Sequence, residues 1–240
     1  MRHSDAMSNG APTPDHVTTT HGHRRPWVVG ISGASGTPYA AAVINGLLDA
    51  GHPVDLVVSK SARLTILDEL GLAWRDAFWR EDLAVLLNRD TSDVDVVTWS
   101  ASDFAAGPSS GSYPARGMVV IPASTASVAG MALGLSKDLL QRAADVTMKE
   151  RRPLVVCVRE TPFTRSTLEH LLALDAAGAV VLPCNPAFYH GPTKMQQLVD
   201  FVAGKVLDVI GVENDLFQRW AGELGAARAS NEKADDGAKT

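Results

Sequence analysis

Short runs of consecutive apolar residues alternate along this chain with stretches whose apolar positions recur at helical spacing. The apolar runs lack the polar alternation of half-exposed strands, so they predict strands that are buried on both faces. These predicted strands cover residues 27–32, 53–59, 95–100, 117–122, 153–158 and 179–183. The periodic stretches predict helices at 37–51, 60–71, 126–149, 165–177 and 193–210.

Strands of this kind, each followed by a helix, predict a parallel sheet covered by helices on both faces. The expected fold class is α/β, a single-domain Rossmann-like (flavodoxin-like) sheet, and ligands of such folds bind beyond the carboxyl ends of the strands. We expect the folded domain to cover residues 27–222. The polar segment 1–26 lacks the apolar core of a signal peptide, so we expect a disordered N-terminal extension, with a similar tail at 223–240.

Two features bear on the compartment. Residues 117–136 contain no charge and reach the length of a bilayer span, but Pro122 and several Ser, Thr and Gly residues interrupt them. We interpret this stretch as a buried strand, a loop and the start of a helix, and expect no membrane contact. Cys157 and Cys184 both lie in apolar runs, which indicates buried thiols and favours a cytoplasmic protein.

The balance of charge limits the ligands. The 240 residues include 22 basic and 27 acidic side chains, a net charge of −5, and 45% hydrophobic residues, which is ample for a core. An acidic chain is a poor generic binder of nucleic acid. However, residues 142–165 hold six basic and three acidic side chains. A local field can oppose the global sign, so an anionic small ligand stays compatible with this chain.

The first candidate site is the glycine-rich turn Gly30-Ile-Ser-Gly-Ala-Ser-Gly36, between the first strand and the first helix. Helix N-termini and glycine backbones favour anions. The GxxGxxG spacing differs from the dinucleotide fingerprint, and the second strand ends in Val58-Ser59-Lys60 without an acidic residue for a ribose. NAD is therefore disfavoured. A mononucleotide phosphate or a flavin edge fits the turn, and a purely structural tight turn is the alternative.

Further candidates follow the later strands. The turn at 122–126 carries Ser124 and Thr125, which could cap a helix or face a ligand, and the loop at 107–112 could be a surface loop or a lid. Arg159-Glu160 directly follows an apolar strand, where an Arg suits bidentate phosphate binding and a Glu can transfer a proton. Tyr189 follows the last strand, as a polar anchor or a turn residue.

Together and in this order, these motifs resemble the UbiX family of flavin prenyltransferases over residues 26–221. The motifs are GISGASG (30–36), VSKSAR (58–63), SSGS (109–112), MVVIPAST (118–125), LLQRAADVTMKERRPLVVCVRETPF (139–163), GAVVLPCNPAFYH (178–190) and DLFQRW (215–220). The block at 139–163 is the most specific. Flavoproteins of the phosphopantothenoylcysteine decarboxylase type share the fold and a similar serine-threonine loop but not this block.

The resemblance implies a flavoprotein domain that joins a dimethylallyl group from dimethylallyl phosphate to reduced FMN, at N5 and C6. The implied catalytic residues are Ser35, Lys149 and Glu160. Those implied to contact FMN are Gly33, Ala34, Ser35, Ser59, Ser124, Thr125 and Arg142. Those implied to hold the prenyl phosphate are Ser110, Gly111, Lys149, Arg159, Tyr189 and Lys205. Phe104 and Trp220 match aromatic positions beside the prenyl chain.

The resemblance further implies a homo-oligomer, a dodecamer, with sites shared between chains, and delivery of prenylated FMN to a UbiD-type decarboxylase. No metal is required for a monophosphate donor; the diphosphate stays open. Three positions depart from common family residues: Phe104, Ala123, and Lys205 where an Arg is usual. The alternatives are an FMN-dependent cysteine-type decarboxylase, an accessory flavin-binding subunit of an aromatic-acid decarboxylase, and a plain FMN storage protein.

Overall fold

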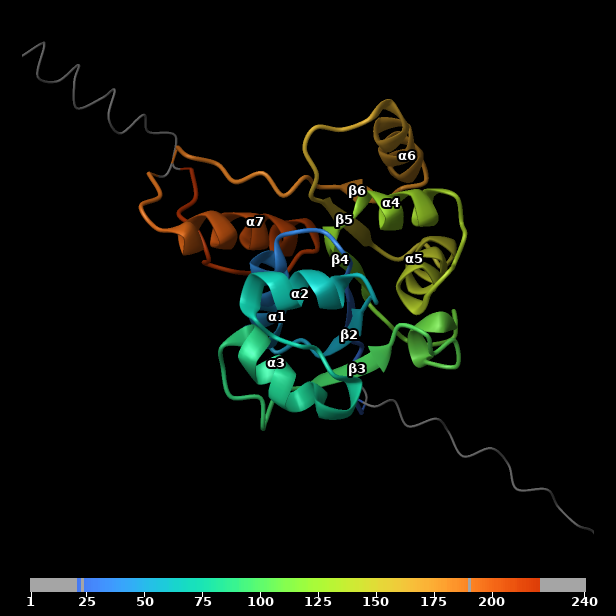
Figure 1. Ribbon diagram of the computed structural model, residues 1–240, viewed down its shortest axis with the longest axis horizontal. Coiled ribbons are helices and arrows are strands. Elements are labelled where there is room, and N and C mark those ends of the chain that lie inside the picture. The colour runs from blue at the N-terminus through green and yellow to red at the C-terminus, as the bar shows by residue number, and fades with distance from the viewer. Residues whose placement is uncertain (1–20, 23, 190, 221–240) are drawn as a thin grey trace, which may run out of the picture.

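The computed structural model describes residues 21, 22, 24–189 and 191–220 (Figure 1). Its centre is a sheet of six strands in the order β3-β2-β1-β4-β5-β6, and each neighbouring pair is parallel. The strands are β1 (Trp27–Ile31), β2 (Val54–Val58), β3 (Val96–Ser100), β4 (Gly117–Ala123), β5 (Leu154–Val158) and β6 (Val180–Val181). This order is that of the doubly wound Rossmann arrangement, and it confirms the predicted fold class. Its topological switch point lies between β1 and β4, where ligands of such sheets bind.

Helices cover both faces of the sheet (Figure 1). One face carries α1 (Thr37–Asp49), α2 (Ala62–Leu70), α3 (Trp79–Leu87) and α7 (Met195–Val209), and the other carries α4 (Thr125–Ala132), α5 (Leu139–Lys149) and α6 (Arg165–Ala176). Two short 3-10 turns, η1 (Asp76–Phe78) and η2 (Gly107–Ser109), lie in the less regular region 72–116.

The structure corrects three of the predicted elements. The helix expected at 126–149 is two helices, α4 and α5, because Gly134 and Ser136 adopt left-handed backbone angles, with φ of 62° and 46°. Helix α3 lies in the region for which no helix was predicted. The strand expected at 179–183 forms ladder bonds only at Val180–Val181.

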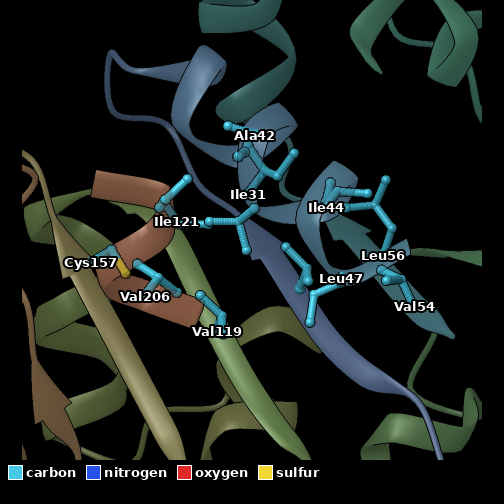
Figure 2. Packing of buried hydrophobic residues seen from close by; sticks show 14 of the residues in the cluster. Ile31, Ala42, Ile44, Leu47, Val54, Leu56, Val119, Ile121, Cys157 and Val206 are labelled. Atoms are coloured by element: carbon cyan, nitrogen blue, oxygen red, sulfur yellow. The ribbon is translucent and has the colours of Figure 1, made fainter. Parts of the chain in front are cut away.

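The strands are buried on both faces, as their continuous apolar runs predict. In β1, Val29 and Ile31 join the core under α1 and α7, whereas Val28 joins the core under α4, α5 and α6. Figure 2 shows the first of these cores, which includes Ile31 and Ile121 of the central strands and Val206 of α7. Rigid strands at the centre fix the places where the loops at their carboxyl ends begin.

Both cysteines are buried free thiols, as predicted. Burial raises the pKa of Cys157 well above its usual value and that of Cys184 to about 12. These thiols are therefore neutral packing groups. The uncharged stretch 117–136 forms β4 and α4, and none of the helices in the described part of the chain is both long and apolar enough to cross a bilayer.

The predicted terminal extensions fall mostly on residues 1–20, 23 and 221–240, which lie outside the described residues. His21 is an informative part of the N-terminal extension, since it is only 5% exposed. Its Nε2 lies 3.2 Å from Asp55 in β2, and its Nδ1 bonds Asp95. Burial lowers the pKa of His21, but the hydrogen bonds with the two carboxylates outweigh that effect and raise it. His21 is thus packed on the domain rather than free of it.

Candidate active site

The loops that follow β1 and β4 are tied together by one buried hydroxyl. Ser32 Oγ donates to the carbonyl of Pro122 at 2.9 Å and accepts from the backbone N–H of Ser124 at 2.7 Å. The loop after β2 comes equally close, because a Cβ on Gly33 would lie 2.5 Å from the Cβ of Ser61. Only glycine fits at position 33. Three loops that carry predicted FMN residues therefore meet at the switch point of the sheet.

The N-terminus of α1 is capped in an unexpected way. The capping position is Gly36, which is left-handed (φ 118°) and has no side chain to offer. Glu69 of α2 takes this role, since its carboxylate accepts from the N–H groups of Gly36 and Thr37, both at 2.8 Å. A carboxylate is favoured there by the helix dipole.

Glu69 is a candidate site residue that the sequence does not reveal. The Ser35 side chain is exposed and hydrogen-bonds to this carboxylate. Burial raises the pKa of Glu69, but the hydrogen bonds from Ser35 and from the backbone of Gly36 and Thr37 outweigh it and hold the pKa below its usual value. Asp68 and Glu69 are adjacent in sequence, and nothing in the periodicity of the helix selects the second.

The predicted hydroxyl residues also have structural roles. Ser124 is the N-cap of α4 and accepts from the N–H of Ser127 at 3.3 Å, so the capping alternative is confirmed. Ser59 is buried, and its Oγ accepts from the N–H of Ala62 at 3.1 Å. A serine oxygen has a second lone pair and a rotatable proton, so both hydroxyls retain capacity for a ligand.

The loop at 107–112 is fixed along α5 at two points. Arg142 Nε donates to the carbonyl of Ser109 at 3.1 Å, and its Nη1 pairs with Asp145 at 2.8 Å. Arg152 donates to the carbonyls of Gly111 and Tyr113, both at 2.8 Å. The loop is therefore held at Ser109 by Arg142 of α5 and at Gly111 by Arg152, which follows this helix.

This anchoring brings the predicted phosphate residues Ser110, Gly111 and Lys149 together at the C-terminus of α5. A Cβ on Gly111 would lie 2.5 Å from Lys149 Nζ, so a glycine lets the ammonium approach the loop backbone. Lys149 forms an ion pair with Glu150, and this contact lowers the pKa of Glu150.

Arg159 and Glu160 follow β5 at the opposite end of that strand. They line a cavity of about 250 Å³ together with Phe163 and Asn185. The backbone N–H of Arg159 donates to the carbonyl of Ala123 at 3.1 Å, and both side chains are exposed. This cavity lies at the carboxyl edge of the sheet, as the sequence predicts.

The structure does not bring all six predicted phosphate residues together. Lys149 precedes β5 and Arg159 follows it, so a five-residue strand lies between them, which corresponds to about 16 Å at ~3.3 Å per residue. Within one chain, the two cations therefore start from opposite ends of β5, which disfavours their holding the same phosphate group.

Of the remaining donor residues, Lys205 lies on α7, and Tyr189 and Trp220 lie in the segments before and after this helix. The Tyr189 ring contacts Trp220 edge-on, with centroids 5.5 Å apart, and Phe201 at 6.0 Å. Lys205 follows Phe201 by one helical turn on the same face of α7. Phe104, the second predicted prenyl-lining aromatic, follows β3 at the far edge of the sheet from β6. Phe104 and Trp220 are 49% and 54% exposed.

Comparison with known proteins bears on this arrangement. A family model described as Flavoprotein matches residues 15–207. The chain is 64% identical over 212 residues to the flavin prenyltransferase UbiX of Streptomyces coelicolor, across 85% of this chain and 98% of that relative.

Two solved structures share the fold. The crystal structure of AnUbiX (PadA1) in complex with FMN and dimethylallyl pyrophosphate matches with a TM-score of 0.73 and 34% identity, over 84% of this chain and all of that one. A dodecameric FMN-dependent Ubix-like decarboxylase from Escherichia coli O157:H7 matches with a TM-score of 0.70 and 36% identity, over 81% of this chain and 98% of that one.

Proposed function

The chain belongs to the UbiX family of flavin prenyltransferases, and we propose that it joins a dimethylallyl group from dimethylallyl phosphate to reduced FMN at N5 and C6. The observation that carries this proposal is the 64% identity over 98% of the Streptomyces coelicolor relative. It favours the prenyltransferase over a cysteine-type decarboxylase, an accessory flavin-binding subunit and a storage protein.

The joined loops at the switch point fit an FMN molecule in their chemistry. Gly33, Ala34 and Ser35 offer backbone and a hydroxyl beside the N-terminus of α1, and Ser59, Ser124 and Thr125 offer three further hydroxyls from neighbouring strands. Arg142 supplies a guanidinium for a phosphate. Reduced FMN, when bound, supplies the nucleophilic N5 and C6 positions.

Proton handling falls to two carboxylates in this proposal. The Ser35 hydroxyl donates its proton to the Glu69 carboxylate. Its oxygen therefore faces N5 as an acceptor and orients the proton there. The proton that leaves C6 as the C6–carbon bond forms would return to the prenyl double bond consumed in that bond, carried by the departing phosphate or by Glu160. Its Oε1 accepts from the N–H of Thr161 at 2.9 Å, which points the carboxylate along the strand-end loop.

The donor phosphate leaves with negative charge, so fixed cations and donors around it lower the barrier by ~3–4 kcal/mol each. We assign this role to Lys149, Arg159 and Lys205, with the hydroxyl of Tyr189 and the backbone of Ser110 and Gly111. The allylic carbon develops positive charge as the bond breaks, and the exposed rings of Phe104 and Trp220 would stabilise it by ~1–2 kcal/mol once water is excluded.

Because Lys149 and Arg159 lie at opposite ends of β5 in one chain, we propose that each site is completed by a second copy of the chain. The exposed aromatics and the exposed apolar side chains of α2 and α6, Leu64, Leu67, Leu168 and Leu172, supply surface for such contacts. The dodecameric relative supports a dodecamer here. Delivery of the product to a UbiD-type decarboxylase and a cytoplasmic location stay predictions from the resemblance.

The test is anaerobic incubation of the protein with reduced FMN and either dimethylallyl phosphate or the diphosphate, followed by mass spectrometry of the flavin. We expect a flavin that is heavier by one five-carbon unit, and the two arms identify the donor. An unchanged flavin with both donors would overturn the proposal.

A further inference from the structure

The segment that follows α7 turns back along this helix and is fastened to it through Asp208 (Figure 1). Arg219 donates to both carboxylate oxygens, from Nη1 at 3.0 Å and from Nη2 at 2.8 Å, and Asn214 Nδ2 donates at 3.0 Å. The Asp208 side chain is 21% exposed, against 56% for Arg219. Hydrogen bonding from Arg219 is the main reason why the pKa of Asp208 is low, so the pair is ionised.

Aromatic packing supports the same closure. The Phe217 ring lies 4.9 Å from that of Phe201, and a Cβ on Gly204 would come within 2.5 Å of it, so the segment lies directly on the helix backbone. The Arg219 guanidinium lies 5.3 Å from the centroid of the Phe217 ring. Bidentate ionic contact and ring packing therefore fix the segment in one position.

This position controls two residues assigned to the donor site. Trp220 follows Arg219 directly and meets the Tyr189 ring. Lys205 lies one turn before Asp208, with its Nζ 3.7 Å from Oδ2. Since Arg219 holds both oxygens of Asp208 at shorter distances, it limits the hold of that carboxylate on the Lys205 ammonium.

We propose that the Arg219–Asp208 ion pair is a positioning pair for the donor half of the site. It seats Trp220 against Tyr189 and leaves Lys205 available to the phosphate of the prenyl donor. The expected effect on KM rests on the proposed function. The expected effect on the segment that follows α7 rests only on its contacts with this helix. Neither member touches the reacting atoms, so neither is a catalytic residue.

The test combines kinetics with hydrogen–deuterium exchange on the full chain with FMN. In Arg219→Ala, we expect KM for dimethylallyl phosphate to rise about tenfold, because binding of the donor is weakened. The change in kcat should be smaller, and the affinity for FMN should be unchanged. Amides of residues 211–220 exchange faster, and those of α5 do not. Arg219→Lys keeps the charge but loses the planar guanidinium, so we expect its KM to lie between those of the wild type and Arg219→Ala.

Arg89→Ala is the matched control, because Arg89 also ties a loop to a helix, through Asp49 of α1 at 2.8 Å. We expect KM in this variant to equal that of the wild type. In Asp208→Ala/Arg219→Ala, KM recovers part of the rise seen in Arg219→Ala, because no carboxylate remains to draw Lys205 away, whereas exchange at 211–220 stays fast.

Several results would overturn the pair. A KM in Arg219→Ala that matches the Arg89→Ala control removes its role in donor binding, and a double variant no better than the single one removes its action through Lys205. The exchange measurement does not depend on activity. Unchanged protection of residues 211–220 in Arg219→Ala would overturn the positioning role of the pair. A wild type that transferred no prenyl group would overturn only the proposed function.

Discussion

The residues assigned to FMN and those assigned to the prenyl phosphate are organised differently. The FMN loops after β1, β2 and β4 converge within one chain and are joined by Ser32 and by the close approach of Gly33 to Ser61. The phosphate residues fall into separate groups, at the C-terminus of α5, beyond β5, and on α7 or just before it. We therefore propose that a single chain pre-forms the FMN half, whereas the phosphate half takes residues from another copy.

The difference follows from the topology of the sheet. Parallel strands bring their carboxyl ends to one edge, so loops after adjacent strands meet automatically. Lys149 ends a helix that runs antiparallel to the strands, which puts it at the opposite edge from Arg159. This placement is the reason why we propose that symmetric assembly, rather than the folding of one chain, unites the two cations.

Arg159→Ala should produce the largest effect, because it removes a cation from the departing phosphate. We expect kcat/KM for the donor to fall by about 10²–10³-fold, with FMN affinity unchanged. Steady-state kinetics and a flavin titration check this. Since Arg159 is exposed, the melting temperature serves as the folding control. Wild-type turnover would remove Arg159 from the phosphate half.

Glu160→Gln comes next and tests the proton step. The amide keeps the shape of the side chain and its bond from Thr161 but cannot accept a proton. We expect ring closure to slow by about 10²-fold, with binding of FMN and donor intact. Stopped-flow spectra of the flavin follow the step, and an unchanged rate would contradict the assigned role.

Ser32→Ala sharpens the comparison from the FMN side. Loss of the hydroxyl leaves the Ser124 N–H without its partner, which should cost about 1–3 kcal/mol of stability. FMN affinity should fall with it, since the β1 and β4 loops are no longer tied, while KM for the donor changes little. Ser102→Ala is the matched control, because the Ser102 hydroxyl shares an exposed hydrogen bond with the hydroxyl of Ser100. Unchanged FMN affinity would show that the tie does not shape the FMN half.

Glu69 gives the smallest effect, on the pH dependence of stability. Its folded pKa lies below the ordinary value of 4.5, so its stabilising contribution is complete above pH 4.5 and is lost as pH falls through the folded pKa. Glu69→Gln should remove about 0.5–1 kcal/mol near neutral pH. The variant and the wild type should converge in acid. Chemical unfolding at several pH values measures this, and a constant difference would contradict it.

The sequence predicts the sheet well because apolar strand cores such as Val28 and Val29 are set locally by burial on both faces. It fails where tertiary contacts decide. The break between α4 and α5 depends on left-handed Ser136, a residue that rarely adopts this conformation. The capping of α1 depends on Glu69 of another helix.

In the candidate site, too, local patterns predict some features and tertiary contacts determine the others. Motifs after the strands locate Ser35, Ser124 and Arg159 at the carboxyl edge, because the alternation of strands and helices predicts parallel strands. The joining role of Ser32 and the separation of Lys149 from Arg159 depend on packing that no spacing encodes. The resemblance to the family names the residues of a complete site, but one chain does not assemble them.

Subunit complementation tests the central claim most directly. Lys149→Ala and Arg159→Ala are each expected to be inactive, because every site lacks one cation. If a site takes Lys149 from one chain and Arg159 from another, oligomers reassembled from an equal mixture of the two variants contain intact sites. About a quarter of the sites should then be intact, and prenylation should return to about a quarter of the wild-type rate. Mixed oligomers as inactive as the single variants would contradict the shared site.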